Sequence, residues 1–151
     1  MLHIVFNEMK RTAKHLVSAM YSPGEDDMEE TWREGHLEAL IHLASGYQYR
    51  ETGVVGHLRR IAAHVRILAG ALGLEEHEVA LLEHASVLHD VGMVDVPESI
   101  VLKEDALTDD ETELMRKHTE LGVSLLSASD IPLMRTASTL AGCHHERYDG
   151  S

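Results

Sequence analysis

The residues best suited to chemistry are histidines, and one of them stands directly beside an aspartate. His89 and Asp90 follow the apolar run Ala85-Ser86-Val87-Leu88, where a buried helix is predicted to end. Gly92 is expected to let the chain turn away from that helix end. An imidazole and a carboxylate side by side are ligands that transition metals use. The pair therefore predicts a metal site that begins with His89 and Asp90.

The chain has 12 histidines among its 151 residues, and several of them share a direction. A lone histidine on an apolar helical face is more often a hydrogen-bonded core residue than a ligand, and we interpret His64 and His84 as structural or solvated. In contrast, His89, His118 and His144 lie on the inward stripes of different predicted helices. Burying unpaired imidazoles is costly, whereas a metal satisfies one nitrogen and leaves the other for a hydrogen bond.

Two further histidines join this predicted site. His57 heads a predicted helix in register with Ile61, and His145 directly follows His144. Five imidazoles and one carboxylate exceed the four ligands that a zinc ion usually accepts, so two metal ions fit better. Two cations bridged by Asp90 and a water generate hydroxide near neutral pH and hold the oxygens of a phosphoryl group. Nitrogen-rich ligation suits iron, manganese or zinc, and the sequence does not choose among them.

Amphipathic patterns predict an all-α fold to position these residues. The helices are expected over residues 2–21, 28–48, 54–72, 75–90, 108–126 and 132–144, with an ordered loop over 92–107. Thr108 and Glu111 form a predicted capping box, and Pro132 suits the first position of a helix. Leu68 and Leu72 are predicted to lie on the buried stripe of their helix.

Length and composition limit the domain organisation and the classes of partner. We expect an N-terminal connector over 1–36, which includes a charged linker at 22–27, and one main domain over 37–151. The net charge of −13 argues against binding a nucleic acid polymer. A single cysteine, Cys143, excludes an intrachain disulfide, and no apolar run approaches the roughly 18 residues of a membrane span. These features predict a cytoplasmic protein without a membrane partner.

Taken together, the motifs resemble the HD-GYP branch of the HD phosphohydrolase superfamily. The resemblance is carried by His57, by the run from Ala85 to Gly92, by Met115-Arg116-Lys117-His118, by the run from His144 to Ser151, and by the loop from Val96 to Lys103. It implies an HD-domain helical bundle, a binuclear or trinuclear metal centre that often holds iron, and hydrolysis of cyclic di-GMP to linear pGpG or GMP. By position, the implied metal ligands are His57, His89, Asp90, His118, His144 and His145.

The chain departs from this family pattern at three places. Met93 stands where the family usually has a lysine thought to assist the phosphate chemistry, and a thioether cannot carry positive charge. Gly53 stands where trinuclear members have a glutamate, which favours two metals. The sequence ends after Ser151, before the Gly-Tyr-Pro signature is reached, and we therefore expect a C-terminally incomplete domain.

The resemblance leaves more than one function open. The first hypothesis is a cyclic di-GMP phosphodiesterase, with His89 and Asp90 as catalytic residues and with Lys103, Lys117 and Arg147 as contacts to substrate phosphates. The same three cations have a plain alternative as solvated surface residues. The other hypotheses are a degenerate signalling or binding module and a hydrolase of another phosphate ester. The N-terminal helices resemble connectors to receiver or sensor modules, or else form a homodimer through a packing arm.

Overall fold

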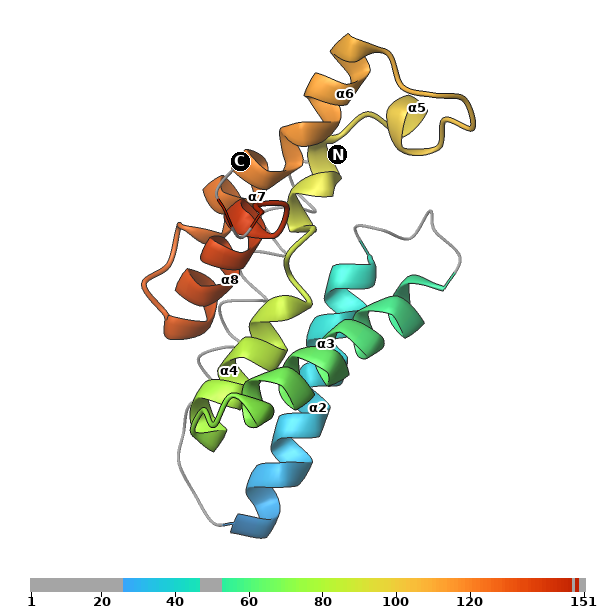
Figure 1. The fold of residues 1–151 in the computed structure, drawn as a ribbon. Helices are drawn as coiled ribbons and strands as arrows, with labels where there is room; N and C mark the ends of the chain where they lie inside the picture. Colours follow the sequence, from blue (N-terminus) through green and yellow to red (C-terminus); the bar gives the residue numbers. More distant parts are fainter. Residues whose placement is uncertain (1–25, 47–52, 148, 150–151) are drawn as a thin grey trace. The chain divides into compact units, whose positions relative to one another are not determined.

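The computed structural model describes residues 26–46, 53–147 and 149, with the side chains of the first helix described from residue 35 onward. Its elements, labelled in Figure 1, are α2 (Asp26–Ser45), α3 (Val54–Ala71), α4 (Glu76–Ser86), the 3-10 helix η1 (Val91–Asp95), α5 (Glu98–Val101), α6 (Asp109–Arg116), α7 (His118–Leu126) and α8 (Pro132–Cys143). No strand occurs in these ranges, which confirms the all-α prediction. The helix predicted over 2–21 lies outside the described residues.

The chain divides into two compact units whose boundary falls inside helix α2. The first unit is Met1–Ala39, of which the structure describes a helical segment from Asp26 onward, and the second is Leu40–Ser151. The predicted connector over 1–36 and domain over 37–151 stay a prediction. All the candidate site residues belong to the second unit, and none of the described helices is long and apolar enough to cross a membrane.

Helices α3 and α4 form a packed hairpin (Figure 1). The chain reverses through Gly73, whose φ of 77° is a left-handed conformation that glycine adopts without strain. Leu58 and Ala62 of α3 are buried, and so are Val79 and Ala85 of α4. His57 lies exposed near the start of α3, and His89 lies just beyond the end of α4.

The predicted burial of Leu68 and Leu72 is wrong. Their side chains are 63% and 80% exposed, although they continue the apolar periodicity of α3. The apolar arc of α3 is wider than the surface that α4 covers, so the side of the helix carrying these leucines stays open. Periodicity identifies the apolar side of a helix, but it does not give the width of the neighbour that packs on it.

The C-terminal half of the second unit packs around α7 and α8. Helix α7 contacts both η1 and α8, and α8 also contacts α4. The buried side chains are Leu126 of α7 and Leu133, Ala137 and Ala141 of α8. Pro132 occupies the start of α8, as predicted. This packing holds the ends of three helices close to the segment that contains Asp90.

Three predicted elements are shorter or more broken than expected. The helix predicted over 75–90 ends at Ser86, and the predicted loop over 92–107 contains η1 and the short helix α5. The single helix predicted over 108–126 is two helices with a break at Lys117. At this break the His118 ring donates to the Met115 carbonyl, and Thr119 Oγ1 donates to the Arg116 carbonyl. Side chains that occupy backbone acceptors in this way compete with the helical hydrogen bonds and end α6.

Candidate metal centre

Three of the candidate ligands share one local geometry. Each histidine follows the last residues of a helix, and its Nδ1 donates to the backbone carbonyl three residues earlier, near the C-terminus of that helix. The pairs are His89 with Ser86 at 2.8 Å, His118 with Met115 at 2.7 Å, and His144 with Ala141 at 3.0 Å. A carbonyl can only accept, so Nδ1 carries the proton and Nε2 keeps its lone pair for a ligand.

Asp90 is the residue on which these lone pairs converge. Its Oδ2 lies 3.1 Å from His89 Nε2, while its Oδ1 lies 3.5 Å from His118 Nε2 and 3.2 Å from His144 Nε2. The two oxygens of one carboxylate therefore face two different groups of histidines. A carboxylate placed in this way is suited to bridging two cations.

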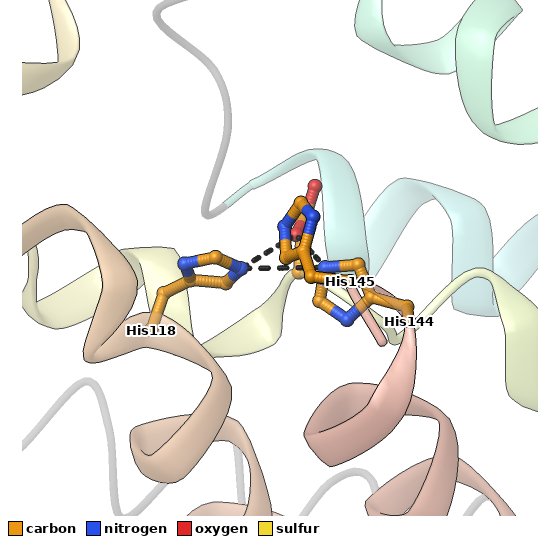
Figure 2. Close-up of side chains that lie close together, drawn as sticks. His118, His144 and His145 are labelled. Carbon is orange, nitrogen blue, oxygen red and sulfur yellow. Dashed lines mark hydrogen bonds and ion pairs between the residues drawn. The ribbon is translucent and has the colours of Figure 1, made fainter. Parts of the chain in front are cut away.

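The most compact part of the centre combines residues from three elements. Asp90, His118, His144 and His145 each offer one ligand atom, and these atoms lie within 4.8 Å of one another (Figure 2). His118 Nε2 and His144 Nε2 are only 3.3 Å apart. Because both Nδ1 atoms donate to carbonyls, two Nε2 lone pairs face each other and repel unless a proton or a cation lies between them. The donor set therefore fits a bound metal ion.

Ring distances describe how His145 and His57 lie. The ring of His145 is 4.1 Å from that of His144 and 5.1 Å from that of His118, measured between centroids. The exposed ring of His57 lies 6.5 Å from that of His89. The six residues singled out from the sequence are thus brought together. Their role as metal ligands stays a proposal.

The cluster also changes the protonation of its own members. Burial opposes ionisation of Asp90, but the hydrogen bond and charge of His89, with the charges of His144 and His118, lower the pKa of Asp90 to about 2. Burial likewise opposes protonation of His89, yet the hydrogen bond and charge of Asp90 raise its pKa. Burial lowers the pKa of His144, and the charge of His145 adds to that effect. Asp90 is consequently an anion at every ordinary pH.

Gly92 has a different role from the one predicted. It does not adopt a left-handed conformation, since only Gly53 and Gly73 do so among the described glycines. Instead, a Cβ on Gly92 would overlap the His118 carbonyl group and lie 2.6 Å from Gly122 N. Glycine is needed because η1 and α7 approach backbone to backbone, and this contact sets His118 beside Asp90.

The predicted substrate contacts lie in distinct settings. Lys103 Nζ is 2.5 Å from Glu111 Oε2, in the same carboxylate that caps α6 through the Thr108 N–H. Lys117 is exposed at the break directly before His118, and Arg147 is exposed two residues after His145. Lys117 and Arg147 are therefore the cations next to the cluster in the chain, while Lys103 is already paired.

The sequence argument missed the backbone acceptors of Ser86, Met115 and Ala141. A signal for them existed in the spacing, because each histidine lies three residues beyond a position near a helix end. Using this signal requires the helix end to be known within one residue. Periodicity does not locate helix ends so closely.

Known proteins share this arrangement of motifs. Residues 43–151 match a protein-family model described as HD domain. The chain is 40% identical over 118 residues to the cyclic di-GMP phosphodiesterase response regulator RpfG of Xanthomonas campestris pv. campestris, covering 78% of this chain and 31% of that protein. It is 40% identical over 119 residues to the 3'3'-cGAMP-specific phosphodiesterase 2 of Vibrio cholerae serotype O1, covering 79% of this chain and 23% of that protein.

A third relative extends over nearly all of the chain. It is the cyclic di-GMP phosphodiesterase of Thermotoga maritima, 30% identical over 149 residues, which are 99% of this chain and 40% of that protein. The chain spans less than half the length of each of these three relatives. The resemblance stated from the motifs is confirmed, and the family match covers most of the second unit, including every candidate ligand. This chain therefore belongs to the HD domain family.

Proposed function

We propose that this chain forms the metal centre of a cyclic dinucleotide phosphodiesterase and that its substrate is cyclic di-GMP. The observation that carries the proposal is the convergence of three histidine Nε2 atoms on the two oxygens of Asp90. The three relatives described above are named as phosphodiesterases of cyclic di-GMP or 3'3'-cGAMP, which supports the substrate class.

The centre is proposed to hold two divalent ions, iron first and manganese or zinc as alternatives. One ion would be held by Asp90, His118, His144 and His145, and the other by Asp90, His89 and His57. When bound, such ions supply an activated hydroxide and neutralise charge that develops on the phosphate oxygens. The carbonyl bonds to Nδ1 keep His89, His118 and His144 in the ligating tautomer.

Positive charge near the centre is proposed to hold the substrate. Lys117 and Arg147 flank the histidines in the chain and are exposed. A cyclic dinucleotide carries two phosphates, so exposed cations next to the ligands in the chain suit the phosphate that is not being cleaved. Lys103 remains a weaker candidate, because its ammonium group already pairs with Glu111.

Turnover of two substrates tests this proposal. The iron-loaded or manganese-loaded protein is incubated separately with cyclic di-GMP and 3'3'-cGAMP, and linear products are separated by chromatography. We expect the linear dinucleotide pGpG from cyclic di-GMP, and expect Asp90→Asn to lose this product while the exposed-site control His77→Asn keeps it. Absence of product with both substrates, from protein shown to contain metal, would contradict the enzymatic proposal.

Met93 favours a second candidate function, a binding module with impaired catalysis. It lies half-buried in η1, and its N–H donates to the Asp90 carbonyl, so its backbone lies next to the ligand pair. Its thioether can neither donate a proton nor stabilise a phosphate. The variant Met93→Lys separates the two functions. A large gain in turnover would identify the natural chain as impaired, whereas unchanged turnover would remove the reason for this candidate.

Three points beyond the centre also stay proposals. They are a homodimer formed through the N-terminal helices, an upstream sensor or receiver module, and a cytoplasmic location.

A further inference from the structure

An ion pair joins α3 to α4, the two helices of the hairpin. Arg66 Nη1 is 3.0 Å from Glu83 Oε2, and Arg66 Nη2 is 2.6 Å from Glu76 Oε1. The Glu83 side chain is only 9% exposed, whereas that of Glu76 is 66% exposed. The guanidinium therefore joins one buried and one exposed carboxylate across the two helices.

Arg66 and Glu83 occupy positions that the helical period assigns to apolar residues, and the Arg66 side chain is 32% exposed. On α3, Arg66 falls between Ala62 and Ala69, four residues after one and three before the other, and both alanines are buried. On α4, Glu83 lies four residues after buried Val79. Residues at these spacings share one helical face, so the pair sits in the middle of the contact.

A charge pair at such a position is better suited to fixing the register of two helices than to increasing the stability of the fold. Burying the Glu83 carboxylate costs desolvation, and the best-attested gain from a buried ion pair is a unique alignment of the elements. The alanines beside Arg66 protrude little and therefore resist sliding weakly. Moving α3 by one helical turn shifts its residues by about 5.4 Å and would take the guanidinium out of reach of Glu83.

The register of this hairpin decides whether two candidate ligands meet. His57 stands nine residues before Arg66 on α3, and His89 stands six residues after Glu83, beyond the end of α4. The two rings are 6.5 Å apart between centroids, at the open end of the hairpin opposite the Gly73 turn. His118, His144 and His145 come from α7, α8 and the residues after α8, so their approach to Asp90 does not depend on where α3 lies.

We propose that Arg66 and Glu83 are positioning residues: their ion pair fixes the register of α3 on α4 and thereby brings His57 to His89 to complete the second metal position. This inference rests on the proposed two-metal centre. It goes beyond that centre because it assigns control of one metal position, and not of the other, to a pair that touches no candidate ligand.

Metal titration of four proteins tests the inference. They are the natural chain, Arg66→Gln, the double variant Arg66→Gln/Glu83→Gln, and the matched control Glu76→Gln, which removes only the exposed partner of the same guanidinium. Each metal-free protein is titrated with Mn²⁺ by calorimetry, and bound metal is counted by elemental mass spectrometry. The double variant guards against misfolding, because it leaves no unpaired charge at the buried position.

The natural chain and Glu76→Gln are expected to bind two equivalents of Mn²⁺. In Arg66→Gln and in the double variant, the first equivalent keeps its affinity and the second binds about 10-fold to 100-fold more weakly, as for other residues that orient metal ligands. Adding Glu83→Arg to Arg66→Glu restores the pair with reversed partners and is expected to recover part of the second affinity.

The possible failures are distinguishable. A natural chain that binds no metal would contradict the two-metal centre and this inference with it. Two equivalents of unchanged affinity in the double variant would contradict only the positioning role of Arg66 and Glu83. Equal weakening of both equivalents would also contradict it, because a general loss of structure does not discriminate between the two positions.

Discussion

His89, His118 and His144 are prepared as ligands by backbone carbonyls. In each case a carbonyl near a helix end accepts the Nδ1–H, and Nε2 faces Asp90. Asp90 in turn remains ionised because three imidazoles surround it, which keeps its pKa at about 2 despite burial. The sequence predicted these residue types and their convergence, but it did not predict the tautomer or the separate roles of the two carboxylate oxygens. Those properties depend on distances of a few tenths of an ångström that no spacing rule contains.

Replacing Asp90 with asparagine tests its role as the shared ligand. The substitution keeps the shape of the side chain but removes the anion that both proposed metal positions use. Mutating a residue that merely orients a metal ligand lowers metal affinity by about 10-fold to 100-fold. For Asp90→Asn we therefore expect the affinity for both equivalents to fall by about 100-fold or more. Calorimetric titration with Mn²⁺ measures this change. His77→Asn is the control, since His77 is exposed at the start of α4, and equal affinities in the two variants would exclude Asp90 as a ligand.

The pH dependence of metal affinity tests the histidines. Asp90 stays ionised above its pKa of about 2, so only the imidazoles exchange protons with the metal between pH 5.5 and 8. Affinity should fall as the pH drops below about 6.5, the ordinary histidine value, because each ligand must lose its proton to bind. Protons compete with the metal for His89 up to the highest pH, because its pKa is raised. They compete for His144 only at the lowest pH, because its pKa is lowered. Affinity that is constant from pH 8 to 5.5 would contradict imidazole ligation.

At the scale of the helices, the predictions succeeded where a local signal marks a boundary. Helix α3 follows its amphipathic pattern to Ala71 before the Gly73 turn, and α8 begins at Pro132. The break at Lys117 was missed because the apolar period continues across it while side chains of His118 and Thr119 take the carbonyls. Gly92 was expected at a turn, but glycine is needed there because the backbone of α7 approaches closely. Contacts between distant segments leave no periodic trace in a sequence.

Two glycine substitutions separate these kinds of constraint. Gly92→Ala places a methyl group against the backbone of α7, and we expect it to destabilise the fold by about 3 kcal/mol and to reduce bound metal by displacing His118. Gly70→Ala serves as the control, because its Cβ would meet nothing within 4 Å. In a helix interior the added alanine should stabilise by about 0.5 to 1 kcal/mol. Urea unfolding measures both, and equal stability of the two variants would contradict the backbone contact.

At the scale of the whole molecule, the core is narrower than the apolar pattern suggests. Leu58 is completely buried on the face of α3 that meets α4, whereas Leu72 on the same helix is 80% exposed. The second unit therefore depends on a limited set of aliphatic side chains. The whole chain has a net charge of −13. An acidic chain repels phosphate esters in general, so a phosphate-binding function needs local positive charge. Bound metal ions, with Lys117 and Arg147 close by in sequence, would supply that charge.

The position of the core predicts that substituting two different leucines will lower the free energy of unfolding by unequal amounts. Leu58→Ala should destabilise by about 2 to 5 kcal/mol, because it removes buried methyl groups and leaves a cavity. Leu72→Gln, on the exposed side, should change stability by no more than about 0.5 kcal/mol. Chemical denaturation monitored by circular dichroism compares them. A cost at position 72 close to that at position 58 would show that the apolar period, rather than the structure, identifies the buried face.

The central claim is that Asp90 and the surrounding histidines bind two metal ions. Elemental analysis of protein purified without added metal, and again after loading with iron or manganese, tests it most directly. The account predicts two equivalents per chain in the loaded protein and a loss of both in Asp90→Asn. Loaded protein that contains no metal, or that retains two equivalents without the Asp90 carboxylate, would contradict it.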